Sequence, residues 1–210
     1  MAAPATRPDQ LYDSARQGLR TRLVAPLSAR ARALRHANFF ALTGAGPDAR
    51  IVDVGCGALG LRALEPELQV TGVDLEARPA YPGPFVQADA NERLPFEDDE
   101  FDLAYCSSLI EHIVPERREL LAAELKRIGR GWFVQTPAYS FPFEPHALLP
   151  MAHWLPPRLR QVYWRLGVTG SWEQVELLRR AEMVALFGEP VLAERLGPLA
   201  KSWISVRAIG

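Results

Sequence analysis

Short apolar runs that alternate with amphipathic stretches divide the chain after residue 50 into predicted strands and helices. Five runs of about five residues, several rich in Val, Ile or aromatic residues, are typical of buried strands; they are residues 50–54, 69–74, 84–88, 101–106 and 131–135. Between the last two, residues 115–128 are predicted to form a helix that has Leu120, Leu121, Leu125 and Ile128 on one face and Gly129 as its stop. Strands that alternate with helices predict an α/β fold around a largely parallel sheet.

The flanking segments have different patterns. Residues 9–42 are predicted to be helical, with a break at Pro26 and a cap at Gly44. Residues 137–157 contain six of the 18 prolines together with several aromatic residues, which indicates an ordered loop. A helix over 173–187 and a terminal hairpin of 191–195 and 203–209, joined through Gly197-Pro198, complete the expected elements.

Composition and charge narrow the class of protein. A length of 210 residues fits one domain with a substantial core, and 48% hydrophobic with 23% charged residues is ordinary for a globular chain. The formal net charge of −1 gives no electrostatic case for a nucleic-acid partner. We find no apolar run near the ~18 residues of a membrane span and no signal peptide, so we expect a cytoplasmic protein without a transmembrane segment. The oligomeric state cannot be read from the sequence.

A glycine-rich loop follows the first predicted strand. Residues 51–60 read IVDVGCGALG, and glycines at Gly55, Gly57 and Gly60 allow the backbone to turn tightly and to approach a ligand closely. The same spacing also fits a dinucleotide site.

Two acidic residues sharpen this interpretation. Asp74 ends the second predicted strand, 19 residues after Gly55, where a carboxylate can accept hydrogen bonds from both hydroxyls of a ribose. Asp89 ends the third, where an acceptor can bind the exocyclic amine of a base. Open α/β sheets bind ligands at the carboxyl ends of their strands. Either acid alone also fits a helix cap or a turn, but together with the glycine loop they predict a nucleoside cofactor site.

These segments resemble a known family. DVGCGALG (53–60), VTGVDLEAR (70–78) and VQADANERLPFEDDEFDLAYCSSLIEHI (86–113) are similar to class I S-adenosylmethionine-dependent methyltransferases, in particular to the small-molecule branch called methyltransferase type 11. The resemblance covers residues 48–136 and implies a Rossmann-like fold: a mostly parallel seven-stranded sheet, helices on both faces and a C-terminal antiparallel hairpin. The third glycine of the family's GxGxG pattern stands one place late here, at Gly60.

The resemblance also implies an organisation of the chain. We expect a single methyltransferase domain over 1–210, with an N-terminal helical cap at 1–47 and a cofactor-binding core at 48–136. A substrate-side insertion at 137–172 and a C-terminal helix and hairpin at 173–210 follow.

The family's cofactor roles transfer to matching positions in this sequence. By resemblance, the residues expected to bind S-adenosyl-L-methionine are Asp53, Gly55, Cys56, Gly57, Asp74, Leu75, Asp89, Ala90 and Cys106. Asp53 and the Cys106 carbonyl would serve the methionine ammonium, and the glycine loop would pass beneath the methionine portion. Asp74 would bind the ribose, while Leu75, Asp89 and Ala90 would contact the adenine. Cys56 and Cys106 are expected to be neighbours and reduced.

Methyl transfer from a sulfonium mainly requires alignment and exclusion of water, and a base only where the acceptor must lose a proton. His112, which follows Glu111 beyond the fourth strand, is the predicted catalytic residue, although a helix-start residue bonded to backbone explains it too. Phe143, Glu144 and His146 are expected to contact the acceptor, whose site the aromatic residues mark as apolar, ring-bearing or lipid-linked. No metal is expected.

The sequence therefore predicts S-adenosylmethionine-dependent methyl transfer to a small-molecule or lipid- or glycan-linked acceptor. A non-catalytic S-adenosylmethionine-binding or interaction module is the first alternative. An NAD-dependent oxidoreductase is the second, and 210 residues leave little room for the separate substrate domain that such enzymes usually carry.

Overall fold

The computed structural model describes residues 37–167 and 175–210. The chain divides into two compact units. We call one the sheet unit, which includes residues 38–142 and 175–210, and the other the hairpin unit, which includes residues 143–167. Each is described by itself.

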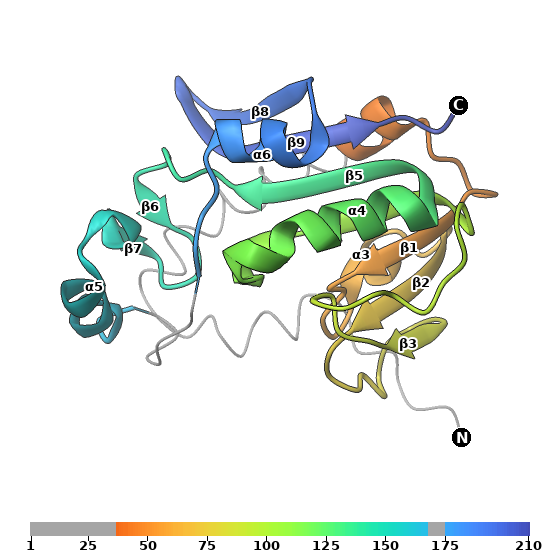
Figure 1. The fold of residues 1–210 in the computed structure, drawn as a ribbon, viewed down its shortest axis with the longest axis horizontal. Coiled ribbons are helices and arrows are strands. Elements are labelled where there is room, and N and C mark those ends of the chain that lie inside the picture. The colour runs from red at the N-terminus through yellow and green to blue at the C-terminus, as the bar shows by residue number, and fades with distance from the viewer. Residues whose placement is uncertain (1–36, 168–174) are drawn as a thin grey trace. The chain divides into compact units, whose positions relative to one another are not determined.

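The sheet unit is built on seven strands in the order β3-β2-β1-β4-β5-β9-β8 (Figure 1). They are β1 (Arg50–Val54), β2 (Gln69–Asp74), β3 (Phe85–Gln87), β4 (Phe101–Ser107), β5 (Gly129–Pro137), β8 (Val191–Leu196) and β9 (Leu199–Arg207). The first five in chain order are parallel, while β9 runs antiparallel to both β5 and β8. This arrangement confirms the predicted sheet and its C-terminal hairpin.

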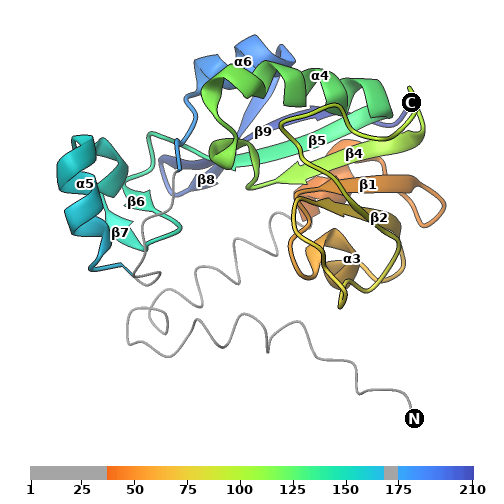
Figure 2. The ribbon, with the colours of Figure 1, turned by 60° about the horizontal axis from the view of Figure 1, so that its bottom comes forward.

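Helices cover both faces of this sheet (Figure 2). The helices α4 (Arg118–Ile128) and α6 (Arg180–Phe187) lie on one face, and α3 (Gly60–Leu64) and the helical residues 37–43 lie on the other. Because strand side chains alternate between faces, Val52 and Val54 of β1 join the core cluster under α4, whereas Ile51 joins the cluster with Leu61 of α3. The sheet is therefore buried on both sides, which explains its continuous apolar runs.

Several elements differ in their bounds from the prediction. The strand β9 begins at Leu199 and not at 203, and α4 begins at Arg118, after a 3₁₀ turn over Pro115–Arg117. The strand β5 is longer at both ends, since Gly129, predicted only as a helix stop, pairs with Phe101 and begins the strand. The helix predicted over 173–187 begins only at Arg180, because Leu178 forms a bridge with Ala138 and its carbonyl accepts a hydrogen bond from the Tyr139 amide.

The N-terminal prediction is confirmed only at its end. Gly44 adopts a φ of 69° and its amide donates to the Phe40 carbonyl at 3.1 Å, as expected for a glycine that ends a helix. The remainder of that predicted helix, including the break at Pro26, lies outside the described residues.

The hairpin unit contains short elements where the sequence predicted a loop. The strands β6 (Phe143–Glu144) and β7 (Leu149–Pro150) pair antiparallel, and a 3₁₀ turn η3 (Ala152–Trp154) leads to α5 (Pro157–Trp164). Strands of only two residues are too short to show an alternation of polar and apolar positions, so periodicity could not predict them. Within residues 37–167 and 175–210, no helix is both long and apolar enough to cross a bilayer.

Candidate functional site

The predicted cofactor residues of the sheet unit lie at the carboxyl edge, where the strand order reverses. The chain proceeds from β1 to β2 on one side, while β4 pairs with β1 on the other. Pairing of β1 with β4 ends at Asp53 and Tyr105, whereas β4 and β5 stay paired as far as Ser107 and Gln135. Such a switch point is the usual ligand crevice of an open α/β sheet.

The glycine loop leaves β1 at this point. The amides of Gly55 and Cys56 both donate to the Val73 carbonyl of β2, at 2.8 and 3.1 Å. Gly57 adopts a φ of 61°, and a Cβ placed on it would meet no heavy atom of the described residues within 4 Å. A ligand can therefore approach the backbone at Gly57 closely.

Asp53 and Gly60 fix the far end of this loop. The buried Asp53 accepts a hydrogen bond on Oδ2 from the Leu61 amide, the first turn of α3, at 2.6 Å. A Cβ on Gly60 would overlap that same oxygen, and Gly60 adopts a φ of 56°. Position 60, one place later than in the family pattern, therefore requires glycine, because the Asp53 carboxylate packs directly against the backbone there.

Burial raises the pKa of Asp53 from 3.8 to about 7. The Leu61 hydrogen bond lowers it in part, and the nearby Asp74 charge raises it further. Asp53 therefore changes its charge near neutral pH.

Asp74 at the end of β2 joins the strand to the glycine loop. Its Oδ2 accepts from the Gly57 amide at 2.8 Å, and its Oδ1 accepts from the Glu76 amide at 3.0 Å and from Arg78 Nη2 at 3.1 Å. Arg78 also pairs with Glu76 at 3.1 Å. A carboxylate offers about four lone-pair positions, and three of those on Asp74 are used.

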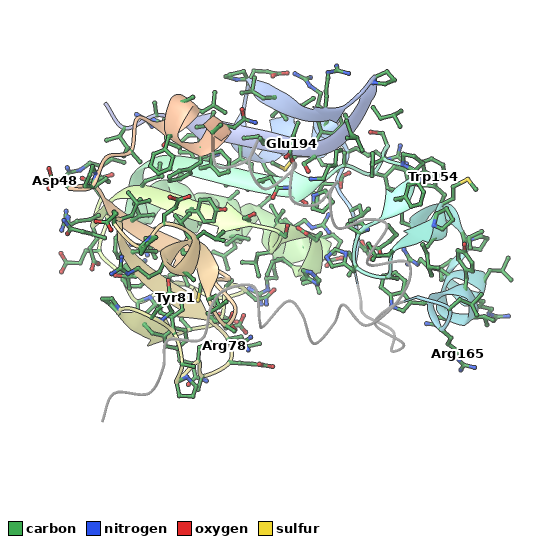
Figure 3. All side chains as sticks on the ribbon, turned by 180° about the vertical axis from the view of Figure 1, so that it is seen from behind. Asp48, Arg78, Tyr81, Trp154, Arg165 and Glu194 are labelled. Carbon is green, nitrogen blue, oxygen red and sulfur yellow. The ribbon has the colours of Figure 1, made fainter. Side chains whose placement is uncertain are left out.

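Sequence reasoning missed Arg78 and Tyr81, which lie on the loop after β2 (Figure 3). The Tyr81 ring packs on Gly72, where a Cβ would lie 2.5 Å from the ring, and it also lies close to Gly60. Its hydroxyl is buried and has no hydrogen-bond partner among the residues described. Burial, followed by the Asp53 charge, raises the pKa of Tyr81, so the hydroxyl stays protonated and able to donate. Neither residue belongs to a periodic pattern that would have marked it.

The residues predicted to contact adenine lie on the loops after β2 and β3, which are paired at Asp74 and Gln87. Asp89 Oδ1 accepts from the Asn91 amide and side chain at 2.8 and 2.9 Å, while its Oδ2 makes no hydrogen bond to a described residue. Leu75 is exposed and Ala90 is half-buried. Asp89 therefore forms a turn, which was the alternative explanation of this residue, through one of its two carboxylate oxygens.

Cys56 and Cys106 are both buried free thiols. Burial raises the pKa of Cys56 to about 12 and that of Cys106 well above its usual value. Both thiols are therefore in the neutral form near neutral pH.

His112 lies just beyond β4, in the 3₁₀ turn η1 (Ile110–His112), and is exposed. Its amide donates to the Leu109 carbonyl at 2.8 Å, which agrees with the alternative that His112 is a helix-start residue bonded to the backbone. The preceding Glu111 is buried, and its Oε2 accepts from the Thr136 hydroxyl at 2.9 Å. Glu111 thus ties the ends of β4 and β5 together and fixes the turn that carries His112.

The three predicted acceptor residues lie together on the β6–β7 hairpin of the hairpin unit. Buried Glu144 accepts from His146 Nδ1 and from the Ala147 amide, both at 2.6 Å, and Phe143 is exposed. Burial acts to raise the pKa of Glu144, but the hydrogen bonds from His146 and the Ala147 amide outweigh it and the pKa is lowered. Glu144 is therefore a carboxylate that fixes the His146 ring.

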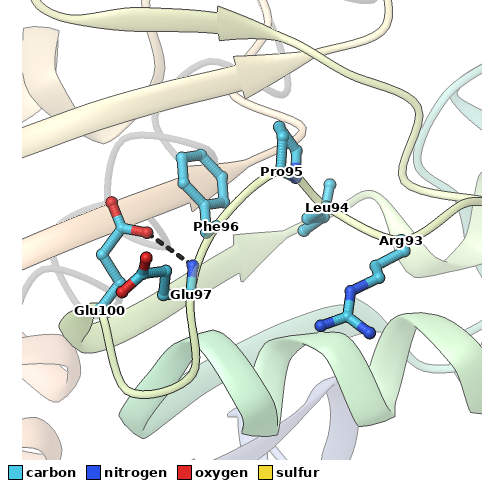
Figure 4. A pocket seen from close by; sticks show the side chains of 6 residues that line it. All are labelled: Arg93, Leu94, Pro95, Phe96, Glu97 and Glu100. Atoms are coloured by element: carbon cyan, nitrogen blue, oxygen red, sulfur yellow. Dashed lines mark hydrogen bonds between the residues drawn. The ribbon is translucent and has the colours of Figure 1, made fainter.

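A shallow hollow of about 750 Å³ lies elsewhere in the sheet unit, lined by residues 93–97 and Glu100 (Figure 4). Arg127, near the end of α4, donates to the carbonyls of Leu94 and Phe96 beside it. The end of α4 and the start of β4 lie at the amino edge of the parallel strands, opposite to Asp74. The hollow is therefore not part of the glycine-loop site.

Comparison with known proteins points to the same family as the sequence resemblance and to the same fold. Residues 52–134 match a family described as a methyltransferase domain. No curated protein matches the sequence. A protein from Pyrococcus horikoshii OT3 is similar in structure at 16% identity and a TM-score of 0.59, over 86% of this chain and 89% of that one.

Two S-adenosylmethionine-dependent methyltransferases also have this fold. One from Archaeoglobus fulgidus is 18% identical, with a TM-score of 0.53 over 85% of this chain and 72% of that one. One from Methanosarcina mazei is 17% identical, with a TM-score of 0.51 over 77% of this chain and 92% of that one.

The family match over residues 52–134 and the fold shared with these solved structures support a class I S-adenosylmethionine-dependent methyltransferase. The match also supports the type 11 kind within that class, since it covers most of the segments that carry the sequence resemblance. The predicted family and fold are thereby confirmed.

Proposed function

We propose that this protein transfers a methyl group from S-adenosylmethionine to a small-molecule or lipid- or glycan-linked acceptor. One observation carries the proposal: Asp74 accepts a hydrogen bond from the Gly57 amide at 2.8 Å, and a Cβ on Gly57 would meet no heavy atom of the described residues within 4 Å. A ribose acceptor and a closely approachable loop thus lie side by side.

The residues present suit this cofactor. Its sulfonium supplies an already activated methyl group, so the protein has to bind and align rather than activate. Asp53 is buried beneath the glycine loop with a pKa of about 7, and a neighbouring ammonium would stabilise its charged form. The buried Tyr81 hydroxyl, which lacks a partner among the described residues, is a further donor on the same side. Leu75, Asp89, Ala90 and the Cys106 carbonyl take the roles that the family resemblance implies.

Ribose binding by Asp74 requires Arg78 to move. Three of about four acceptor positions on the carboxylate are in use, and two ribose hydroxyls need two. Two of the present donors are backbone amides fixed by the loop, whereas Arg78 is a half-buried side chain with a second partner in Glu76. Arg78 is therefore the group that gives way.

For the acceptor we propose His112 as the base or orienting group, and Phe143, Glu144 and His146 as contacts. Glu144 fixes the Nδ1 side of the His146 ring at 2.6 Å and so holds the orientation of the imidazole. The exposed Phe143 ring suits an apolar or ring-bearing acceptor.

A methyl-transfer assay tests this function. The full-length protein is incubated with methyl-labelled S-adenosylmethionine and sets of apolar ring-bearing, lipid-linked and glycan acceptors, with Asp74→Ala as the matched control. Label in an acceptor that depends on Asp74 supports the proposal. If the cofactor binds tightly but no acceptor in these sets is labelled, the non-catalytic alternative replaces it.

A further inference from the structure

The helix α5 of the hairpin unit turns an apolar side to solvent. Leu159, Val162 and Leu166 are 59%, 63% and 63% exposed. Leu159 and Val162, three residues apart, lie on one side of the helix, and Leu166 follows in the turn just after its last residue, Trp164. Trp164, on the opposite side, is only 2% exposed. The helix is therefore anchored by its tryptophan while its aliphatic side chains point outward. We call these three residues the α5 stripe.

Exposed apolar side chains concentrate in this unit. Among the described residues, six of the ten exposed large apolar side chains lie within 143–167; they are Phe143, Met151, Trp154, Leu159, Val162 and Leu166. Single exposed apolar residues are ordinary, but such a concentration marks an interaction surface.

The charge beside the α5 stripe has one sign. Arg158 and Arg165 are exposed. Arg158 lies in the first turn of α5, and Arg165 is its C-cap with helical φ and ψ, so the seven-residue spacing places both on the same flank of the stripe. In Figure 3 the Arg165 side chain extends outward from α5. Neither arginine pairs with a carboxylate of the described residues. Residues 145–167 contain three arginines and no aspartate or glutamate, although the whole chain carries 25 acids, about one residue in eight.

We infer that the α5 stripe and its two arginines dock the protein on the surface of a bilayer that contains anionic lipid. Aliphatic side chains enter the boundary between headgroups and acyl chains, and arginines beside them bind the anionic headgroups. An eight-residue helix lies in such a surface and does not cross it.

This chemistry favours a bilayer over other occupants. A nucleic acid would satisfy the arginines but offers no apolar layer for three aliphatic side chains. A second copy of the same stripe would bring like charges together. The inference concerns binding alone and does not depend on methyl transfer.

Vesicle flotation of the full-length protein tests the inference. Vesicles of phosphatidylcholine alone are compared with vesicles that contain about 30% phosphatidylglycerol. We expect flotation with the anionic vesicles only, and less of it as salt is raised. Leu159→Ser with Val162→Ser is expected to lower the partition coefficient at least tenfold, and Arg158→Gln or Arg165→Gln about fivefold each.

Matched controls lie in the sheet unit. Leu199→Ser removes an exposed leucine and Arg117→Gln an exposed arginine that has no ion pair with a described residue, and both are expected to float like the parent. Thermal unfolding confirms that each variant is folded.

Three results would overturn the inference. One is flotation that is absent or equal on both vesicle types. The second is α5 variants that float like the two controls. The third is no vesicle binding by the parent protein together with another occupant of this surface. That occupant would be a second copy, if Leu159→Ser with Val162→Ser dissociates a dimer, or duplex DNA, if the arginine changes abolish a DNA complex.

Discussion

Replacing Asp74 by alanine is expected to weaken binding of S-adenosylhomocysteine at least tenfold. Each hydrogen bond from a ribose hydroxyl to the carboxylate contributes about 1.5–3 kcal/mol, and 1.4 kcal/mol corresponds to about a factor of ten. Displacing Arg78 costs part of this gain, because its 3.1 Å pair with Asp74 must be broken. An ion pair that water can reach contributes about 0.2–1 kcal/mol. Breaking the Arg78–Asp74 pair therefore lowers the affinity for the ligand by about fivefold or less.

The same reasoning makes an opposite prediction for Arg78. Arg78→Met removes a competitor for Asp74 and is expected to tighten S-adenosylhomocysteine binding by up to about fivefold. In the Asp74→Ala background the same change should have no effect, because the competition no longer exists. Titration calorimetry of the four proteins closes this double-mutant cycle.

Folding must be controlled, because Asp74 also accepts from the Gly57 and Glu76 amides. Denaturant unfolding of each variant, together with Asp74→Asn, which retains one acceptor oxygen, separates loss of the loop from loss of the ligand contact. The reasoning is refuted if folded Asp74→Ala binds as tightly as the parent. It is equally refuted if Arg78→Met weakens binding to the same extent in both backgrounds.

Three further predictions concern the glycine loop and His112, the proposed base or orienting group. The folded protein retains on Asp53 a proton that the unfolded chain releases above its usual pKa of 3.8, so the free energy of unfolding should fall as pH rises from about 4 to about 7. Asp53→Asn should flatten that slope in denaturant titrations, and an unchanged slope contradicts the assignment. Gly60→Ala should lower stability by about 1–3 kcal/mol, since its φ of 56° and the overlap with Asp53 both disfavour a Cβ; Gly46→Ala, with nothing described within 4 Å, is its control, and equal unfolding midpoints would contradict the account. His112→Ala should lower turnover about 100- to 10,000-fold if His112 is the base, with affinity for S-adenosylhomocysteine unchanged, and full turnover by the variant rejects the role.

The elements that sequence predicted well are those whose burial follows a simple period. The strands β1, β2 and β4 are short apolar runs because helices cover both faces of the sheet, and α4 has a clean apolar face. The predicted start of α6 was wrong because contacts with residues distant in the sequence fix the backbone before Arg180. Residues 173–179 suit a helix locally, but the Leu178 carbonyl accepts from both the Tyr139 amide and the Trp203 indole, which holds the backbone against the sheet edge.

Some residues of the candidate site could likewise be predicted from the sequence, and others could not. Asp74 and Gly57 could be placed together in advance, because the carboxyl ends of neighbouring parallel strands meet at one edge. The Arg78 ion pair and the Tyr81 ring could not, because both depend on how the loop after β2 folds back, and no period in residues 75–84 encodes that path. The role of Gly60 became visible only once Asp53 was located beside it.

The account's central claim is that the glycine loop and Asp74 bind the adenosyl cofactor of a methyltransferase. Titration calorimetry of the full-length protein with S-adenosylmethionine, S-adenosylhomocysteine and NAD tests it most directly. We expect saturable binding of both adenosyl ligands at a single site, no heat from NAD, and weakening by Asp74→Ala. Binding of NAD in preference to S-adenosylhomocysteine, or no binding of any of the three by the folded protein, would contradict the claim.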